Sequence, residues 1–177
     1  MKIKFTTTTS RDELVQILSL QKMNLKSAVS ENEIANEGFV TVEHNYDILK
    51  RMNDVCPHII AKDGDKVVGY ALSMDPVFGD EILVLQPMFI ELKKRNIINF
   101  LAMGQICVAK THRKQGIFRG LYEAMKKASY PTYEYIITEV DATNSRSLGA
   151  HLAIGFEKIC TYHSLGQDWE LISLKTF

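Results

Sequence analysis

The second half of the chain alternates segments of strand and helix character with short links, and this alternation restricts the fold more than any other feature. Residues 100–109 and 135–140 are apolar enough for buried strands. Each is followed by a segment with helical periodicity, at 116–128 and 144–154. A strand, a helix and a second strand in this order form a right-handed crossover between parallel strands. We therefore expect parallel pairing in this half of the chain.

Hairpins are expected on both sides of this pattern. Residues 58–62 and 66–72 flank Asp63-Gly64-Asp65, in which Asp-Gly supplies the positive φ angles of a tight turn. Further strands are expected at 2–7, 156–163 and 169–174. The sequence therefore predicts a mixed α/β (α+β) fold. Its central twisted sheet has about six to seven strands, is largely antiparallel and carries helices on both faces.

Helices are also expected in the first half. Ser10 and Glu13 fit a capping box, and an apolar helical face continues to Leu25. Residues 30–33 repeat the capping signal for a shorter helix, and residues 46–52 form another. Residues 77–96 form a long connection with one short helix, and such insertions are often functional. In the second half, the apolar face of the helix over 116–128 consists of Ile117, Leu121, Ala124, Met125 and Ala128.

Composition limits both the organisation of the chain and its partners. The 177 residues contain no repeat or linker, so we expect a single domain over residues 1–177. The 21 Lys and Arg balance the 21 Asp and Glu, which argues against nucleic acid as a partner. No apolar run is long enough to span a bilayer, so no membrane partner is expected.

Cysteine usage favours a cytoplasmic location. Cys56, Cys107 and Cys160 have no paired spacing, and no N-glycosylation acceptor is present, which suits a reducing compartment. Cys160 and His163 form one ligand-like pair without a second pair, so no metal is expected. Cys107 lies in an apolar strand, which favours a buried thiol over a nucleophile.

A basic loop precedes the helix that begins at Gly116. The N–H groups at a helix N-terminus favour an anion, and basic side chains gather around this one. A phosphate-bearing ligand and a solvated basic turn explain this cluster equally well. The loop is not a P-loop, and one glycine is too few for a dinucleotide fingerprint. The basic residues are Lys110, His112, Arg113, Lys114 and Arg119.

Two motifs resemble the GNAT N-acetyltransferase superfamily. Arg113-x-x-Gly116-x-Phe118, after a strand that ends at Val108, resembles its acyl-CoA signature. Asn144-x-x-Ser147, His151 and Gly155-Phe156 resemble a later motif of the same superfamily. Each motif is weak alone, but the two stand in the right order with a strand between them. The resemblance implies a GNAT-like acyl-CoA N-acyltransferase fold with acetyl-CoA as co-substrate.

The resemblance also implies a role for each part of the cofactor site. The backbone of Ile106, Cys107 and Val108 would hold the acyl group and the pantetheine arm. A backbone N–H near Val108 would polarise the thioester carbonyl. Asn144 would bond the pantetheine, and the helix that contains Ser147 would line the reactive end. The pyrophosphate would lie on the loop residues Arg113, Lys114, Gln115, Gly116, Ile117, Phe118 and Arg119.

Two positions depart from the usual superfamily pattern. Phe118 is bulky where many members have Gly or Ala, so its side chain must point away from the cofactor. His151 stands where many members have a tyrosine that protonates the departing thiolate. His151 is a candidate general acid, a hydrogen-bond donor or a packed histidine. Glu139 is the first candidate for the general base, with Glu91, Asp75, His44 and His163 behind it.

The expected function is an acetyl-CoA-dependent N-acetyltransferase that acts on a primary amine by direct attack in a ternary complex. The acceptor would be a small molecule or a peptide. The alternative is a non-catalytic acyl-CoA-binding or regulatory domain of the same fold. In the segment 76–100, Phe78, Met88 and Phe89 fit an apolar wall of the acceptor site and a homodimer interface equally well.

Overall fold

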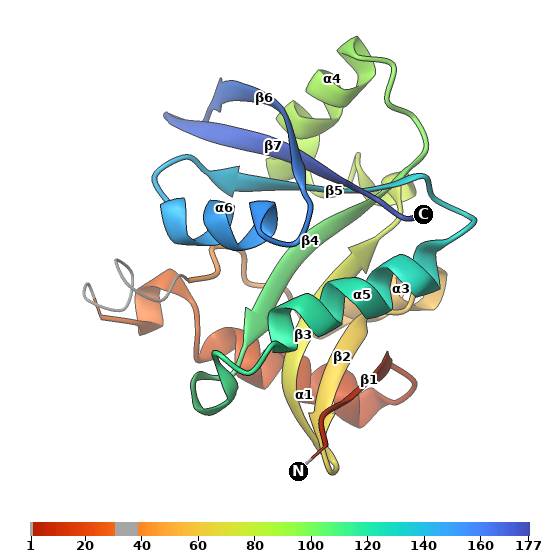
Figure 1. The fold of residues 1–177 in the computed structure, drawn as a ribbon, viewed down its shortest axis with the longest axis vertical. Coiled ribbons are helices and arrows are strands. Elements are labelled where there is room, and N and C mark those ends of the chain that lie inside the picture. Colours follow the sequence, from red (N-terminus) through yellow and green to blue (C-terminus); the bar gives the residue numbers. More distant parts are fainter. Residues whose placement is uncertain (1, 31–38) are drawn as a thin grey trace. The chain divides into compact units, whose positions relative to one another are not determined.

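The computed structural model describes residues 2–30 and 39–177. The expected short helix after Ser30 lies outside the described residues. Within them, a seven-stranded sheet has the order β1-β2-β3-β4-β5-β7-β6 (Figure 1). The strands are β1 (Lys4–Thr7), β2 (Ile59–Asp63), β3 (Lys66–Met74), β4 (Phe100–Val108), β5 (Tyr135–Asp141), β6 (Glu157–Ser164) and β7 (Gln167–Lys175). The helices are α1 (Arg11–Lys22), α3 (Tyr46–Val55), α4 (Gln86–Lys94), α5 (Ile117–Ser129) and α6 (Ser145–Leu152).

The pairing of these strands confirms the predicted sheet. β4 and β5 run parallel, whereas β1–β2, β2–β3, β5–β7 and β6–β7 are antiparallel. The chain divides into two compact units. The first unit comprises Met1–Met74 and Met103–Ala128, and the second comprises Asp75–Ala102 and Ser129–Phe177. That these units form one domain stays a prediction.

The predicted capping box fixes the start of α1 in the first unit. Ser10 Oγ accepts from the N–H of Glu13 at 3.2 Å, and the Glu13 carboxylate accepts from the N–H of Ser10 at 3.3 Å. The same carboxylate accepts from Lys62 Nζ of β2 at 2.8 Å, so one side chain both caps α1 and ties it to the sheet. Burial alone would raise the pKa of Glu13, but the bonds from Lys62 and Thr9 hold it below its usual value.

Helices cover both faces of the strands in the first unit (Figure 1). α1 and α3 pack on β3 from one side, and Leu14, Ile17 and Leu49 of these helices are buried in the core. α5 packs on the other side, where a Cβ at Gly69 of β3 would come within 3.1 Å of Ile117 Cγ2. The glycine therefore permits this close approach of helix and strand.

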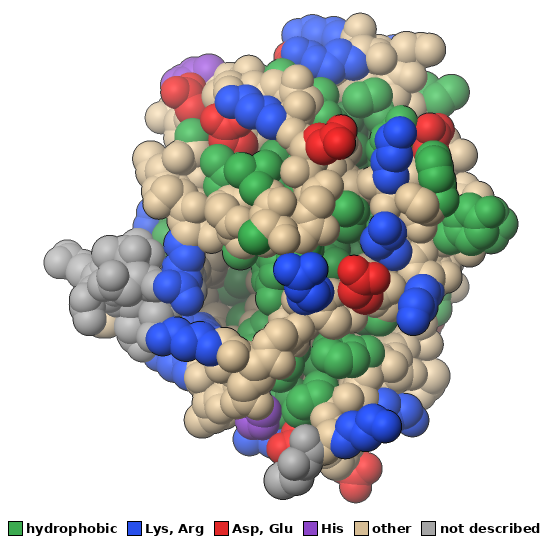
Figure 2. All heavy atoms as spheres, in the orientation of Figure 1, with side chains coloured by type: hydrophobic (Ala, Val, Ile, Leu, Met, Phe, Trp, Pro, Cys, Tyr) green, Lys and Arg blue, Asp and Glu red, His purple; other side chains and the backbone are tan. Residues whose placement is uncertain are grey.

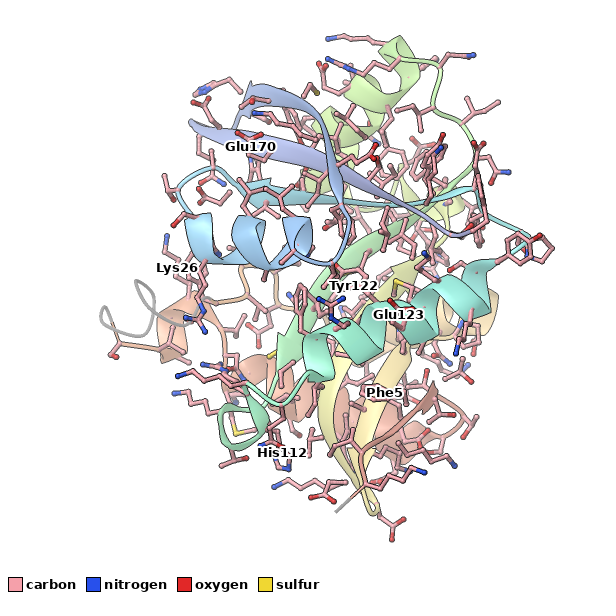
Figure 3. All side chains as sticks on the ribbon, viewed as in Figure 1. Phe5, Lys26, His112, Tyr122, Glu123 and Glu170 are labelled. Carbon is pink, nitrogen blue, oxygen red and sulfur yellow. The ribbon has the colours of Figure 1, made fainter. Side chains whose placement is uncertain are left out.

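The N-terminal strand also contacts α5. The Phe5 ring of β1 points toward this helix (Figure 3) and fills the space where Gly120 would otherwise carry a Cβ. Gly120 weakens the helix by about 1 kcal/mol relative to alanine. In exchange, the ring lies directly on the helix backbone at Gly120.

The second unit contains the predicted C-terminal hairpin and the connection that precedes β4. β7 lies between β5 and β6, with Leu171 opposite Glu139 on one side and Cys160 on the other. The expected short helix in the connection is α4, which buries Met88 and Leu92. Phe89 of α4 lies against Phe100 of β4, with ring centroids 5.6 Å apart.

Two details differ from the sequence expectation. α1 ends at Lys22, and Leu25 instead forms a parallel bridge with Val40. Ala128 is exposed although the periodicity of α5 places it on the apolar face, while Tyr122 is fully buried. A large aromatic side chain gains more from burial than a methyl group at the end of a helix. None of the helices in the described ranges is long and apolar enough to cross a bilayer.

Candidate functional site

The loop between β4 and α5 contains two residues in the left-handed region. A 3₁₀ turn over Lys110–His112 follows β4. Lys114 has φ 62° and Gly116 has φ 76°. A side chain other than glycine is strained at such angles, and only glycine adopts them at no steric cost. Backbone in this conformation turns successive N–H groups toward one side and forms an anion-binding concavity.

Gly116 is the first residue of the α5 hydrogen-bond ladder. Its carbonyl accepts from the N–H of Gly120 at 3.0 Å. In a helix that begins in this way, the N–H groups of the first turn have no carbonyl acceptor within the helix. They point along the helix axis together with the positive end of its dipole. The loop and the first turn of α5 therefore have the geometry of a phosphate site.

The side chain of Phe118 turns onto its own helix. Its ring packs edge-on against that of Tyr122, with centroids 5.2 Å apart and an interplanar angle of 67°. Tyr122 is fully buried. The bulky residue in the signature is thus accommodated by an aromatic pair four residues apart, which leaves the backbone N–H as its contribution to the site.

Two of the basic side chains in the loop hold its own structure. Arg113 Nε donates to the carbonyl of Val108 at 3.2 Å, and Nη2 donates to Asn24 Oδ1 at 2.8 Å. His112 Nε2 lies 3.4 Å from the carboxylate of Asp63, the last residue of β2. Arg113 therefore ties the loop to the end of α1. Lys110, Lys114 and Arg119 are exposed, and both basic and acidic side chains are scattered over the face in Figure 2.

The end of β4 presents alternating environments. Ile106 and Val108 are half-buried, whereas Cys107 lies in the core of the first unit. Burial raises the pKa of the Cys107 thiol to about 12. A thiol with that pKa is almost entirely protonated at neutral pH, and the thiolate is the nucleophilic form. Cys107 can thus contribute its backbone to the site but not a covalent intermediate.

Glu139 of β5, in the second unit, has the properties of a base. Burial raises the pKa of its carboxyl to about 7, and the hydrogen bond from the Tyr162 hydroxyl opposes this rise in part. Tyr162 comes from β6, across β7 from Glu139. Burial and the neighbouring Glu139 raise the pKa of Tyr162, so its hydroxyl stays protonated. The hydroxyl therefore donates a hydrogen bond to the Glu139 carboxylate. A group with a pKa near 7 is well matched to general base catalysis at neutral pH.

His151 of α6 is buried and committed to its own helix. Its Nδ1 lies 2.7 Å from the carbonyl of Ser147, one turn earlier. A carbonyl only accepts, so the ring proton is on Nδ1, and Nε2 of the neutral ring carries a lone pair. Burial lowers the pKa of His151 to about 4. At neutral pH Nε2 therefore carries no proton, and donation from that atom first requires protonation.

Asn144 caps the same helix. Its Oδ1 accepts from the N–H of Ser147 at 3.0 Å. This leaves the amide NH₂ of Asn144, rather than its oxygen, as the group with donors for a ligand.

The predicted site residues are grouped by unit. Ile106 to Val108 and Arg113 to Arg119 lie in the first unit, where the structure brings β4, the loop and α5 together. Glu139, Asn144, Ser147 and His151 lie in the second unit. Within residues 2–30 and 39–177, no three His, Cys, Asp or Glu side chains are close enough to hold a metal ion.

Several polar residues have hydrogen-bond roles that were not predicted from the sequence. Gln21 and Tyr70 hydrogen bond to Gln105, which is buried in β4. Asn24 anchors Arg113, and Tyr162 anchors Glu139. The one available signal was a glutamine in an otherwise apolar strand, since a buried amide requires partners. The identity of those partners depends on tertiary contacts.

Comparison with known proteins identifies one family and many similar folds. The model of the acetyltransferase (GNAT) family matches residues 22–156. Among solved structures, the ribosomal-protein-S18-alanine N-acetyltransferase of Escherichia coli has a TM-score of 0.65 and 10% identity, over 99% of this chain and 94% of that one. The structure of yncA from Salmonella typhimurium, with its cofactor acetyl-CoA, has a TM-score of 0.67 and 12% identity, over 100% and 95%.

A third structure is similar to the same degree. The NatC complex bound to Gag peptide and CoA has a TM-score of 0.67 and 18% identity, over 99% of both chains. Identities this low establish the fold and no more. No match is found among curated protein sequences.

Proposed function

Because the chain belongs to the acetyltransferase (GNAT) family, we propose that it transfers the acetyl group of acetyl-CoA to a primary amine. The observation that carries this proposal is the loop in front of α5, where Lys114 and Gly116 are left-handed. This geometry suits the pyrophosphate of CoA, as described for helix N-termini in general. The acetyl-CoA in the yncA structure and the CoA and peptide in the NatC structure support the choice of co-substrate and acceptor class.

In the proposed reaction the amine attacks the thioester directly. The backbone of Ile106, Cys107 and Val108 holds the acyl end, and the N–H near Val108 stabilises the oxyanion. Glu139 accepts the proton that the amine loses, directly or through a water, since a carboxylate with a pKa about 7 is half ionised at neutral pH. The C–S bond then breaks, and CoA leaves as a thiolate that takes up a proton. The buried thiol of Cys107 is consistent with a ternary complex without an acyl-enzyme.

The remaining contacts follow from the family resemblance. The amide of Asn144 donates to the pantetheine, and the helix that contains Ser147 lines the reactive end of the cofactor. His151 supplies the proton for the thiolate only if Nε2 has first been protonated, which the low pKa disfavours at neutral pH. We therefore assign to His151 the weaker role of a residue that orders α6 by donating a hydrogen bond from Nδ1 to the carbonyl of Ser147.

One observation favours a second candidate function. The ring proton of the buried His151 is on Nδ1, where it bonds to the carbonyl of Ser147. The expected acid therefore has no proton on Nε2 to give to the thiolate. A domain that binds acyl-CoA without transfer needs no such acid. This alternative keeps the loop before α5 and the cofactor, and it removes the role of Glu139.

The two functions are separated by measuring binding and turnover on the same preparation. Acetyl-CoA is titrated by calorimetry, and release of the free thiol is followed with a panel of small amines and short peptides. Thiol release that depends on the amine supports transfer. Tight binding without release on any amine supports the binding domain, and absence of binding overturns both.

A further inference from the structure

A buried chain of hydrogen bonds links β4, α1 and the segment before α3. Gln105 Oε1 accepts from the Tyr70 hydroxyl at 2.6 Å and from Gln21 Nε2 at 2.8 Å. Gln105 Nε2 donates to the carbonyl of Val42 at 2.9 Å. Gln21 Oε1 accepts from the backbone N–H of His44 at 2.8 Å, and Gln21 Nε2 lies 2.9 Å from His44 Nδ1. All of these groups belong to the first unit.

Two backbone groups fix the direction of every bond in this chain. The carbonyl of Val42 can only accept, so the NH₂ end of Gln105 faces it and the oxygen faces Gln21 and Tyr70. The backbone N–H of His44 can only donate, so the oxygen of Gln21 faces it. The NH₂ group of Gln21 must then supply both remaining bonds, to Gln105 Oε1 and to His44 Nδ1. The positions of oxygen and nitrogen in both amides therefore follow from these two backbone groups.

This arrangement determines the state of the His44 ring. Since Nδ1 accepts a hydrogen bond from Gln21, it carries no proton, and the proton of the neutral ring is on Nε2. A second proton on Nδ1 would face the NH₂ group of Gln21. Burial acts in the same direction and lowers the pKa of His44.

The Nε2–H group of His44 remains available to a ligand. Among residues 2–30 and 39–177, it has no hydrogen-bond partner. No buried side-chain nitrogen or oxygen in the described part of the chain lacks a partner, so Nε2 must be accessible to solvent. It is therefore a donor that solvent can reach, on a half-buried ring whose opposite side is fixed.

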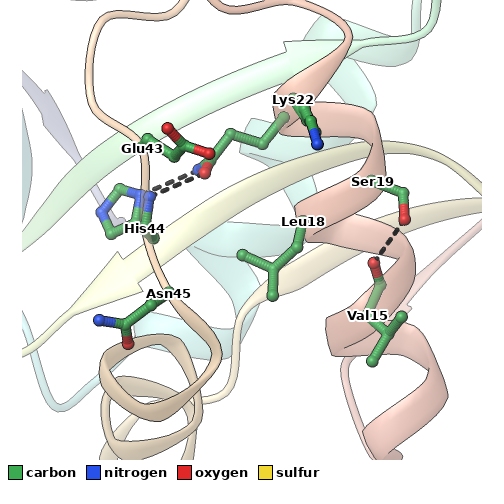
Figure 4. Close-up of a pocket in the computed structure, with 8 residues that line it drawn as sticks. Val15, Leu18, Ser19, Lys22, Glu43, His44 and Asn45 are labelled. Atoms are coloured by element: carbon green, nitrogen blue, oxygen red, sulfur yellow. Dashed lines mark hydrogen bonds between the residues drawn. The ribbon is translucent and has the colours of Figure 1, made fainter.

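The neighbourhood of His44 suits a small polar molecule. His44 is one of the residues that line a pocket of about 560 Å³ between α1 and residues 43–45, and its ring turns the Nδ1 side toward α1 (Figure 4). Leu18 forms an apolar wall, and Glu43 and Lys22 place opposite charges on its lining. Gln105 lies three residues before Val108, where the acyl group is proposed to lie, so the network connects the pocket segment with that strand.

We propose that Gln21 holds His44 as the Nε2–H tautomer, so that His44 donates a hydrogen bond to an oxygen of the amine acceptor and does not act as the general base. Gln21 is then a positioning residue and His44 a specificity residue. The oxygen is a carbonyl or carboxylate near the reactive nitrogen, as in an amino acid amide or a peptide N-terminus. This inference rests on the proposed function for the identity of the ligand, but not for the state of the ring.

The state of the ring is tested by ¹⁵N NMR of the histidine side chains at pH 7. The chain has five histidines, and the His44→Gln variant assigns the signals of His44. We expect a protonated Nε2 and an unprotonated Nδ1. A proton on Nδ1 in the unmodified protein overturns the proposal.

The role of Gln21 is tested by reversing the polarity of its bond. In Gln21→Glu the carboxylate can only accept, so we expect the His44 proton to appear on Nδ1. Gln16→Glu makes the same change in charge on the same helix without contact to His44, and we expect the signals of the unmodified protein. If Gln21→Glu also leaves Nδ1 unprotonated, Gln21 does not control the ring.

The donor role is tested with two amines that differ in one group. Alaninamide has a carbonyl beside its amine, and isopropylamine lacks it. We expect His44→Phe to raise KM for alaninamide about three- to tenfold with little change in kcat, as for loss of one hydrogen bond. KM for isopropylamine should not change, and His44→Gln, which keeps an N–H donor, should restore most of the difference.

The opposite results are equally specific. If His44→Phe and His44→Gln both lower kcat for the two amines and remove the acidic limb of the pH profile, His44 is the base and the proposal is wrong. Equal KM changes for both amines also overturn the donor role. If no amine releases CoA, the proposed function fails, and the NMR measurement still decides the state of His44.

Discussion

Glu139 titrates in the range where the proposed reaction would take place. Its pKa is raised to about 7 by burial, and the bond from Tyr162 opposes the rise. We expect kcat to fall about tenfold per pH unit below pH 7, as the base becomes protonated. Glu139→Gln should lower kcat on the order of a hundredfold. Stopped assays of thiol release from pH 5.5 to 9 measure both effects.

Two controls separate catalysis from structure at this residue. Tyr162→Phe removes the donor that lowers the pKa of Glu139, so the acidic limb should move to higher pH. Glu134→Gln changes an exposed carboxylate just before β5 and should leave the profile unchanged. A limb that stays at pH 7 in Glu139→Gln would show that another group is the base.

His58 makes the fold sensitive to acid. It is fully buried, its Nδ1 accepts from the Ser73 N–H at 3.1 Å, and its Nε2 lies 3.0 Å from the carbonyl of Leu49. Burial lowers its pKa to about 4. An unfolded histidine has a pKa of about 6.5, so the unfolded state binds the proton first as the pH falls. Stability is therefore lost from pH 6.5 downward and the loss is complete near pH 4.

The size of this effect follows from the pKa difference. The free energy of unfolding should fall by about 3 kcal/mol between pH 6.5 and pH 4 because of His58 alone. His58→Gln should be less stable at pH 7, and its deficit against the unmodified protein should shrink by about that amount at pH 4. Urea unfolding at both pH values measures this difference. The pH dependence of stability also contains contributions from His151, in the same direction, and from Glu139, in the opposite direction. The difference between His58→Gln and the unmodified protein isolates the contribution of His58.

At the scale of elements, the loop before α5 depends on the left-handed angle of Gly116. Gly116→Asp places a carboxylate where the phosphates are proposed to bind, so we expect CoA affinity to fall at least about tenfold, since 1.4 kcal/mol of repulsion suffices. Gly116→Asn has the same shape without charge, and asparagine tolerates this angle. Its affinity should lie much closer to that of the unmodified protein. Calorimetric titration with CoA measures all three.

A further variant controls for backbone strain. Gly166, in the β6–β7 turn of the second unit, has φ 78° and open space around its Cα, as Gly116 has. Gly166→Asp thus makes the same substitution outside the loop, and CoA affinity should not change. Equal losses in the two aspartate variants would argue against a phosphate site in the loop.

Elements set by local sequence were predicted well. The capping box of α1, the Asp-Gly turn before β3 and the amphipathic pattern of α5 all depend on residues a few positions apart, and the structure confirms them. The bond from His151 to Ser147 has the same character, since residues four apart in a helix are neighbours. It could have been inferred from the sequence.

The candidate site was less accessible because its contacts are not local. Gln105 and Gln21 are 84 positions apart. Glu139 and Tyr162 come together only because β5 and β6 pair with the same strand, β7, one on each side of it. Strand order and register decide such pairs, and neither follows from periodicity. The roles of the network around His44 and of Tyr162 therefore emerge from the tertiary structure.

For the molecule as a whole, cofactor binding and stability should be linked. A ligand that binds the folded state alone stabilises it by about 2.7 kcal/mol at a hundred times its Kd. For a chain of this size that corresponds to a rise in Tm of about 5 to 10 °C. We expect this rise with CoA, and at most about half of it in Gly116→Asp, since a Kd weakened tenfold leaves about 1.4 kcal/mol of stabilisation. A thermal scan with and without CoA measures the rise in Tm. An equal rise in both proteins would show that CoA binding does not depend on the loop before α5.

The division of the chain into units has a consequence for biosynthesis. The first unit is assembled from Met1–Met74 and Met103–Ala128, with part of the second unit encoded between them. A ribosome releases Gln21 and Tyr70 well before Gln105, the residue to which both bond in the finished protein. Until β4 emerges, burial would leave the Tyr70 hydroxyl and one amide donor of Gln21 without the Gln105 acceptor, which costs about 1–3 kcal/mol for each group. Closure of the first unit is therefore less favourable until the chain has passed through part of the second unit and β4 supplies this acceptor.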